Sequence, residues 1–360
     1  MKSESTWRDR FPPLLIITGL LFGIAGVGLF LAGNPGNMGV CVACFLRDIS
    51  GALGLHQAAL VQYLRPEILG IVLGAFIAAR VSREVQPRTG ASPLLRFVIA
   101  AFVMMGALVF LGCPLRLALR LGAGDANALL GLAGFVGGIF VGSLFLKSGT
   151  DLGRAHPESR PQAGWIVPLI VLGALAVFFA APHLLKFSST GPGSMHAPIW
   201  LSLAAGLGLG ALAQRSRFCF AGGIRDLFLF RSPHLFTGFV GVVVATLVIT
   251  LISGHFRFGF EGQPIAHSDH LWNALGMALV GLGSVLIGGC PLRQLVLAAQ
   301  GNADSGVAVA GLIAGAAIAH NFGLAASPKG VPVAGMIAVG VGLAVCLVVA
   351  SVFRERNSAA

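Results

Sequence analysis

One motif that combines a thiol with a cation occurs twice in this chain, as GCPLR at 112–116 and again at 289–293. Proline is favoured in the first turn of a helix, so Cys113 and Cys290 are predicted to cap helix N-termini just after a glycine break. The free N–H groups and the dipole of a helix N-terminus attract anions. The motif therefore predicts two broken helices whose second halves present a thiol and positive potential to a small anion.

A second cysteine motif is also repeated, because CVACFLRD, which begins at Cys41, aligns with CFAGGIRD, which begins at Cys219. Cys44 has no counterpart in the second copy. Thiols are polarizable, weak S–H donors, which suits a ligand whose contacting atom is sulfur or selenium. Recurrence at predicted breaks indicates a functional role for these cysteines, whereas Cys346 is interpreted as an apolar filler in a helix.

Four arginines accompany these motifs, namely Arg116 and Arg293 in the GCPLR copies and Arg47 and Arg225 in the other pair. An unpaired charge near the centre of a bilayer costs about 3 kcal/mol or more, so each must face a cavity or find a partner. One interpretation pairs them with acids as structural ties, and the other directs them at an anionic substrate. Structural roles are predicted for Pro114, Pro291, Asp48, Asp226, Asp125 and Asp304.

The composition indicates the elements that must position these residues. Hydrophobic residues make up 56% of the 360 residues and charged residues only 10%, which predicts an all-α polytopic membrane protein in a lipid bilayer. The net charge of +11 is explained by basic cytoplasmic loops. A single tyrosine and no nucleic-acid motif exclude a nucleic-acid partner, and no metal site, cofactor or enzymatic activity is predicted. Small residues such as those in GLAGFVGG at 131–138 predict close helix packing.

Ten apolar runs are long enough to be candidate crossings of a bilayer about 30 Å thick. They are 13–33, 66–81, 93–112, 125–147, 164–185, 197–213, 233–254, 271–289, 304–326 and 331–353. The first is interpreted as a retained helix rather than a signal peptide.

Basic residues at both ends predict cytoplasmic termini in a bacterial inner membrane, because Arg8 and Arg10 precede the first run and Arg354 and Arg356 follow the last. The same rule places the arginine-rich segments that hold Arg80, Arg83, Arg88 and Arg96, and Lys147, Arg154 and Arg160, inside. The segments 185–197 and 255–270 are placed outside.

The motifs recur in the same order at an offset of 177 to 179 residues, which predicts a duplication. Five crossings in each copy would make the second enter the membrane from the opposite side, giving an inverted-topology repeat with a pseudo-twofold axis. Cys113 and Cys290 are then expected to approach one site from opposite sides. The predicted parts are a cytoplasmic N-terminus at 1–12, a first repeat at 13–185, a linker at 186–196, a second repeat at 197–353 and a cytoplasmic tail at 354–360.

Two further segments, 33–56 and 215–230, are too short and polar to span but too apolar for ordinary loops. Irregular backbone at membrane depth survives only when it is buried in protein or lines a cavity. Both are therefore predicted to be re-entrant. Broken helices in matching positions of inverted halves are the best sequence pointer to a transporter's substrate site.

These motifs resemble one known family. GVCVACFLRDISGALGLH, both GCPLR copies, SRFCFAGGIRD and QGNADS are similar to the YeeE/YedE family of bacterial inner-membrane proteins, and most to its YedE branch, which is associated with selenium transport. The resemblance implies uptake of an inorganic sulfur compound, thiosulfate in YeeE members, through an hourglass-shaped protein in which cysteines pass the ion along. By motif these would be Cys113 and Cys290, with Cys41 or Cys44 at the entry. A small cytoplasmic sulfur-carrier protein is implied as a partner.

Three functions remain to be compared. The leading hypothesis is import of a small sulfur or selenium anion, with thiosulfate as the concrete expectation, drawn in by arginines and helix N-termini and passed between thiols. An alternative is a membrane thiol-disulfide oxidoreductase that uses Cys41 and Cys44 as a redox pair. A third, a Cu(I) transporter, is disfavoured by arginines beside the cysteines and by only seven methionines.

Overall fold

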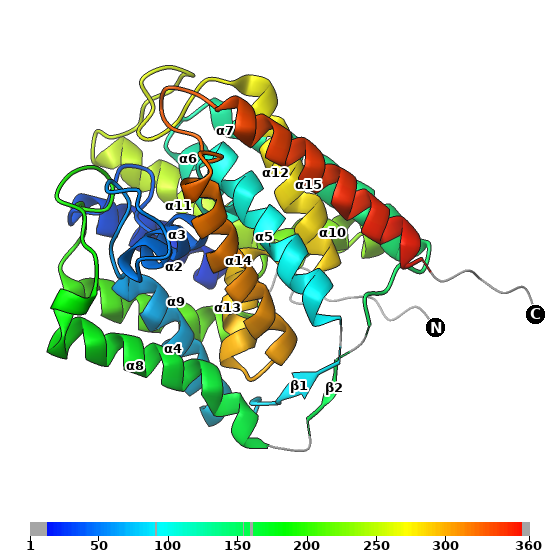
Figure 1. The fold of residues 1–360 in the computed structure, drawn as a ribbon. Coiled ribbons are helices and arrows are strands. Elements are labelled where there is room, and N and C mark those ends of the chain that lie inside the picture. Colours follow the sequence, from blue (N-terminus) through cyan, green and yellow to red (C-terminus); the bar gives the residue numbers. More distant parts are fainter. Residues whose placement is uncertain (1–12, 91, 154, 159–160, 355–360) are drawn as a thin grey trace, which may run out of the picture.

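The computed structural model describes residues 13–90, 92–153, 155–158 and 161–354, and its regular structure is almost entirely helical (Figure 1). The α-helices are α2 (Pro13–Leu31), α3 (Val42–Ala52), α4 (Pro66–Val81), α5 (Pro93–Phe110), α6 (Pro114–Gly122), α7 (Asn127–Lys147), α8 (Ile166–Ala180), α9 (Ile199–Ser216), α10 (Phe220–Phe230), α11 (Phe236–Ile252), α12 (His270–Leu286), α13 (Pro291–Ala299), α14 (Ala303–Asn321) and α15 (Val333–Val352). Short 3-10 turns, η1 (Pro161–Trp165) and η2 (Pro182–Leu184), flank α8, and β1 (Arg88–Thr89) pairs antiparallel with β2 (His156–Pro157).

Each of the ten predicted apolar runs contains a helix, which confirms a mainly helical membrane protein. Within the described residues, six helical runs are long and apolar enough to cross a bilayer: α2, α7, α14, α15, and the two runs that join α5 to α6 and α12 to α13. Two shorter apolar helices, α8 and α11, accompany them. The count of ten crossings stays a prediction, and most of the terminal segments, with Arg8, Arg10 and Arg356, lie outside the described residues, as do Arg154 and Arg160.

The two GCPLR motifs interrupt helices as predicted. Helix α5 ends at Leu111, which takes a left-handed φ of 62°, and α6 begins at Pro114. Helix α12 is followed by Gly288 with φ +85°, and α13 begins at Pro291. Each proline occupies the first helical turn, where its missing N–H costs nothing.

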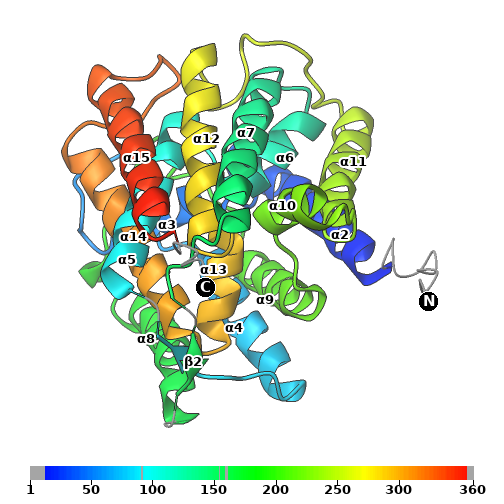
Figure 2. The same cartoon turned by 90° about the vertical axis from the view of Figure 1, so that its right-hand side faces the viewer.

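The helices pack in pairs that correspond when seven is added to the label of each helix from α2 to α7 and subtracted from the label of each helix from α9 to α14. Helix α2 lies along α11 as α9 lies along α4, and α5 lies along α14 as α12 lies along α7. The pairs α3 with α14 and α6 with α11 are likewise matched by α10 with α7 and α13 with α4. Helices α5 and α12 contact each other in the middle of the bundle (Figures 1 and 2).

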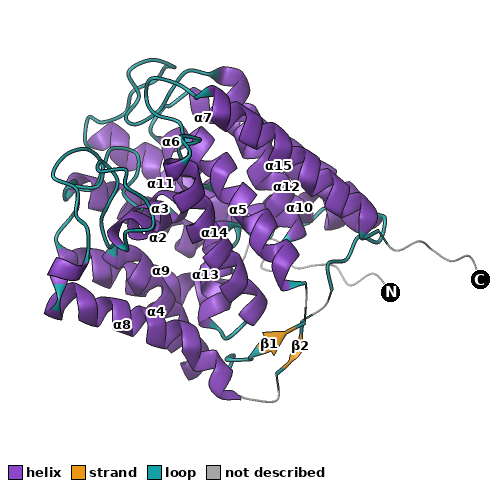
Figure 3. Cartoon of the chain, in the orientation of Figure 1, coloured by secondary structure: helices purple, strands orange, loops and turns teal. Residues whose placement is uncertain are grey.

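Helices α8 and α15 break this correspondence. Helix α15 packs on α5 and α12, whereas α8 packs mainly on α4 and lies far from α15 in Figure 1. The two ends of the bundle also differ, because the longest loops gather at its upper left in Figure 3 and the strand pair lies at its lower right.

Glycines allow the closest helix contacts, as expected for the glycine-rich stretch of α7. A Cβ on Gly134 would overlap the Ala274 carbonyl of α12, and one on Gly138 would overlap the Ala278 carbonyl. Backbone approach of this kind is the usual route to tight packing where lipid removes the hydrophobic drive.

Candidate functional site

The cysteines form two thiol pairs. The Sγ atoms of Cys41 and Cys113 are 3.8 Å apart, and those of Cys219 and Cys290 are 3.9 Å apart. All of these thiols are free and buried. The sequence predicts that Cys113 and Cys290 share one site, but the sulfur contacts form two, each joining a GCPLR cysteine to the repeated cysteine about 70 residues before it. We call them the N-terminal and C-terminal thiol pairs.

All four paired cysteines occupy the N-cap positions of short helices, namely α3, α6, α10 and α13. The Cys41 sulfur accepts the Cys44 N–H at 3.4 Å, and the Cys219 sulfur accepts the Gly222 N–H at 3.2 Å. The sulfurs of Cys113 and Cys290 make no such cap bond. Two helix N-termini therefore meet at each thiol pair, which concentrates positive potential there.

The glycine of GCPLR gives the arginine room to fold back toward the thiol. A Cβ on Gly112 would lie 2.9 Å from Cδ of Arg116, and a Cβ on Gly289 would lie 2.9 Å from Cγ of Arg293. The aliphatic stem of each arginine therefore occupies the space beside a backbone that carries no side chain. This contact explains why glycine precedes the cysteine even though neither glycine has a left-handed φ.

Arg116 is fully buried and surrounded by backbone carbonyls. Its guanidinium donates to the carbonyls of Asn37 at 3.0 Å and Ile265 at 3.1 Å, and to that of Leu111. Its Nη1 also lies 3.7 Å from the Cys44 sulfur. Pro264 and Ile265 of the 253–269 loop thus supply part of the shell of carbonyls around this cation.

Arg293 occupies the matching position but has a different environment. Its side chain lines a polar pocket of about 260 Å³ with Arg88, Arg217, Glu84 and Gln214 among the other lining residues. We call this the Arg293 pocket. Within the described part of the chain, the buried Nη1 of Arg293 has no hydrogen-bond acceptor.

Arg47 and Arg225 form the adjacent ion pairs that the structural interpretation predicts. Arg47 donates to Asp48 Oδ1 at 2.7 and 2.9 Å, and Arg225 donates to Asp226 Oδ1 at 2.9 and 3.0 Å. Asp48 also accepts from Arg65 at 2.7 Å, which the sequence analysis did not single out. Among the described hydrogen bonds, neither arginine donates to a cysteine sulfur, and each pairs with the acid that follows it in its helix, α3 or α10.

Asp125 and Asp304 find partners other than the repeated arginines. Asp125 binds the fully buried Arg120 at 2.6 Å, and Asp304 lies 3.9 Å from Arg96. The Arg120 guanidinium also stacks over the Phe110 ring at 4.2 Å. Arg120 was missed because a lone arginine one turn after Arg116 resembles an ordinary helix-end charge, although GAGDA begins only two residues later, at Gly122.

Two buried histidines tie loops to the site. His267 Nε2 lies 2.7 Å from the Val109 carbonyl, while its Nδ1 accepts the Asp269 N–H at 3.2 Å. His56 repeats the pattern, with Nε2 at 3.0 Å from the Arg47 carbonyl and Nδ1 accepting the Ala58 N–H at 3.3 Å. Both patterns require the neutral ring protonated at Nε2. Burial lowers the pKa of His267 and of His56, which favours the same form.

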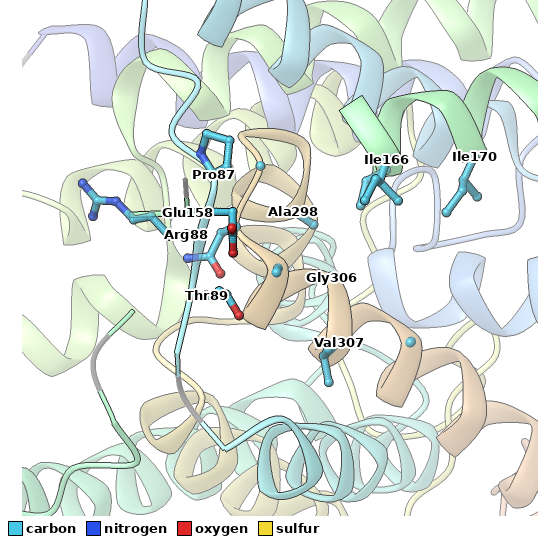
Figure 4. A pocket seen from close by; sticks show the side chains of 14 residues that line it. Pro87, Arg88, Thr89, Glu158, Ile166, Ile170, Ala298, Gly306 and Val307 are labelled. Atoms are coloured by element: carbon cyan, nitrogen blue, oxygen red, sulfur yellow. The ribbon is translucent and has the colours of Figure 1, made fainter. Parts of the chain in front are cut away.

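A separate pocket of about 390 Å³ lies between α8 and α14 (Figure 4). Ile166, Ile170 and Val307 give it an apolar wall. No cysteine lines it, and the Arg88 guanidinium points away from both isoleucines in Figure 4. Without a cysteine among its lining residues, this pocket does not match the predicted thiol chemistry.

Other chemistries find little support in this arrangement. The described residues contain no group of three or more His, Cys, Asp or Glu side chains placed to hold a metal ion. Cys41 and Cys44 are both fully buried, and the Cys41 sulfur lies 3.8 Å from that of Cys113. A redox pair needs an exposed attacking sulfur, so the oxidoreductase alternative lacks its main requirement.

Comparison with known proteins points to sulfur chemistry. A family model described as Sulphur transport matches residues 215–354. The thiosulfate transporter TsuA of Spirochaeta thermophila is 32% identical over 93 residues, which cover 26% of this chain and 27% of that protein. The thiosulfate transporter TsuA of Escherichia coli K12 is 29% identical over 116 residues, 32% of each. The chain thus spans about a third or less of the length of these two relatives.

Proposed function

We propose that this chain is a multi-pass membrane transporter that imports a small inorganic sulfur anion, with thiosulfate as the substrate or a selenium analogue of the same size and charge. The similarity to a sulfur-transport family model and to two thiosulfate transporters supports this class. Six helical runs long enough to cross a bilayer support the location.

The observation that carries the proposal is the geometry of the two thiol pairs. At each pair, two short helices direct their N-termini at two sulfurs less than 4 Å apart. N–H groups attract the charge of a thiosulfate-like anion, and the thiols offer weak S–H bonds to its soft sulfur. Because each contact is weak, the ion is released as readily as it is bound, which transport requires.

We propose that the ion passes from the N-terminal to the C-terminal thiol pair. Cys41 is the better candidate than Cys44 for the entry cysteine, because Cys41 contacts Cys113 whereas Cys44 contacts Arg116. Arg116 and Arg293 supply positive charge beside the pairs, and Arg47 and Arg225 act through the helices that they hold.

The proposed architecture is an inverted repeat of residues 13–185 and 197–353 with ten crossings and two re-entrant segments, 33–56 and 215–230. The correspondence of helix pairs under a shift of seven labels supports it, since a pseudo-twofold axis between α5 and α12 would exchange those pairs. The position of all four paired cysteines at helix N-caps supports it further.

We propose that the arginine-rich end of the bundle faces the cytoplasm of a bacterial inner membrane and that both termini lie there. Contacts between distant segments agree with this orientation. On the predicted inside, Gln86 N–H donates to the Gln300 carbonyl and Thr150 Oγ1 donates to the Ala350 carbonyl. On the predicted outside, Asn321 donates to the Leu55 carbonyl. A soluble sulfur-carrier partner on the inside stays a prediction.

An uptake assay tests the function. Cells without other thiosulfate importers should grow on thiosulfate when they express this chain and lose growth with Cys113→Ala or Cys290→Ala. Neither sulfur caps a helix, so these changes remove a thiol without removing a cap bond. Cys346→Ala, at a buried cysteine outside both pairs, is the matched control and should grow normally.

Two outcomes would contradict the proposal. Failure of the unaltered chain to support growth, despite normal amounts in the membrane, would refute sulfur-anion transport. Normal uptake by both the Cys113→Ala and the Cys290→Ala variant would refute the thiol pathway. Competition of labelled thiosulfate uptake by selenite, selenosulfate and sulfite would identify the preferred anion.

A further inference from the structure

We infer that the Arg293 pocket is a separate binding site for a small divalent oxyanion, which holds the transported ion on the predicted cytoplasmic side of the C-terminal thiol pair. The identity of the bound ion rests on the proposed function. The pocket itself is lined by side chains that belong to neither thiol pair. Its walls come from the α4–β1 connection, the end of α9, α13 and the α13–α14 turn.

The pocket carries a net positive charge. Three arginines line it, Arg88, Arg217 and Arg293, against one acid, Glu84. Glu84 is already engaged, because Oε2 accepts Gln214 at 2.9 Å and Oε1 lies 3.4 Å from Arg215, which does not line the pocket. The three lining cations are therefore not neutralised within the pocket.

Arg293 has a buried donor without an acceptor, and Arg217 adds an exposed cation beside it. Nη1 of Arg293 is buried and has no hydrogen-bond partner among the described residues, whereas the Arg217 side chain is exposed. A buried charged donor without an acceptor is strongly unfavourable. Oxygen atoms of a divalent anion would satisfy these donors, and two guanidinium groups present the fork geometry that oxyanions prefer.

The contrast with Arg116 shows that free donors are not a general property of GCPLR arginines. Arg116 has the same position in its motif, yet the carbonyls of Asn37, Leu111 and Ile265 engage its guanidinium. Backbone carbonyls surround Arg116, whereas Arg293 lines a polar pocket of about 260 Å³. An ion that leaves the C-terminal thiol pair would meet this pocket next.

Arg88 lines this pocket as well as its apolar neighbour. Arg88 and Asn302 line both pockets, but the Arg88 guanidinium extends away from Ile166 and Ile170 in Figure 4. It contacts the Gln86 side chain, which is another wall of the Arg293 pocket. The apolar crevice and the polar pocket are thus distinct in chemistry, although they adjoin.

Binding to the purified full-length protein tests the inference, with thiosulfate and sulfate as the two probes at low ionic strength and calorimetry as the readout. Replacing two lining cations together, Arg88→Gln with Arg217→Gln, should raise the dissociation constant of both anions about tenfold or more. Glu84→Gln should lower it about threefold, because it removes the one negative charge while keeping an acceptor for Gln214. Lys329→Gln, an exposed loop cation on the other face, is the charge-matched control and should bind normally.

The double arginine variant is expected to bind more weakly and Glu84→Gln more tightly, so the test remains decisive even if one variant folds poorly. Unchanged affinity in both the double variant and Glu84→Gln would overturn the site. A chain that binds both anions in this pattern but does not support growth on thiosulfate would refute the transport function and leave the site intact. If the chain transports thiosulfate but all pocket variants bind both anions with unchanged affinity, the site is refuted and the transport function stands.

Discussion

Replacing Gly112 with alanine is expected to destabilise the protein far more than the matching change at Gly289. Both glycines have backbone conformations that alanine can adopt, because neither has a left-handed φ. In each case the new Cβ would lie 2.9 Å from a methylene of the following arginine, which is closer than van der Waals contact allows. The arginine side chain must move, and the two arginines differ in how freely they can do so.

The magnitudes follow from the partners of each guanidinium. Arg116 donates to four carbonyls, and hydrogen bonds from charged groups contribute about 1.5–3 kcal/mol each, so loss of one or two costs roughly 3 kcal/mol. Arg293 has no such bonds in the described structure and can adopt another rotamer at a cost of about 1 kcal/mol. Alanine also lowers the backbone entropy of the unfolded chain, which stabilises both variants by about 0.4–1 kcal/mol. The expected difference is therefore about 2 kcal/mol.

Thermal unfolding of both purified variants in the same detergent measures this difference. We expect Gly112→Ala to melt several degrees below the unaltered protein and Gly289→Ala to melt near it. Arg116→Ala combined with Gly112→Ala should melt no lower than Arg116→Ala alone, since the closest contact of the new Cβ is with the Cδ of Arg116, which alanine lacks. Equal melting temperatures for the two alanine variants would refute the idea that Arg116 is locked and Arg293 is free.

Three further predictions concern other parts of the molecule. Asp125→Asn should lower stability by about 3–5 kcal/mol because it leaves the buried Arg120 unpaired, and adding Arg120→Leu should recover much of the loss, as measured by thermal unfolding. Burial lowers the pKa of His267, so as the pH falls the unfolded chain is protonated at this residue before the folded protein is. The free energy of unfolding should therefore be constant above about pH 6.5 and decrease below it. The His267→Gln variant should show a weaker decrease. Phenylarsine oxide, which bridges adjacent thiols, should block uptake, and an excess of a free dithiol should restore it, because the buried sulfurs, 3.8 and 3.9 Å apart, must become accessible when an ion passes them. Insensitive uptake would contradict a pathway past the thiol pairs.

Features encoded by near neighbours were predictable from the sequence. The helices begin close to where apolar runs begin, and α4 has the predicted bounds, Pro66–Val81. The breaks at GCPLR were predictable because proline and glycine act on their own backbone. The ion pairs of Arg47 with Asp48 and of Arg225 with Asp226 were among the predicted alternatives, since each joins adjacent residues.

Long-range contacts were beyond sequence reasoning. Arg65 reaches Asp48 across 17 positions, and its other donors bind the carbonyls of Met195 and Pro192 about 130 residues away. Nothing in the local pattern around Arg65 indicates that partner set. The same applies to Arg120, whose isolated charge gives no sign of complete burial.

The sequence by itself determined a helical membrane protein, two broken helices and the positions of Cys113 and Cys290 at the start of short helices, because apolar length, proline geometry and capping are local properties. Only the tertiary structure decided which thiols meet, with Cys113 beside Cys41 rather than Cys290. It also decided that Arg116 is sealed by carbonyls from distant loops while Arg293 faces a polar pocket. Identical motifs thereby acquire different environments, because the groups that surround a buried cation come from wherever the chain folds back.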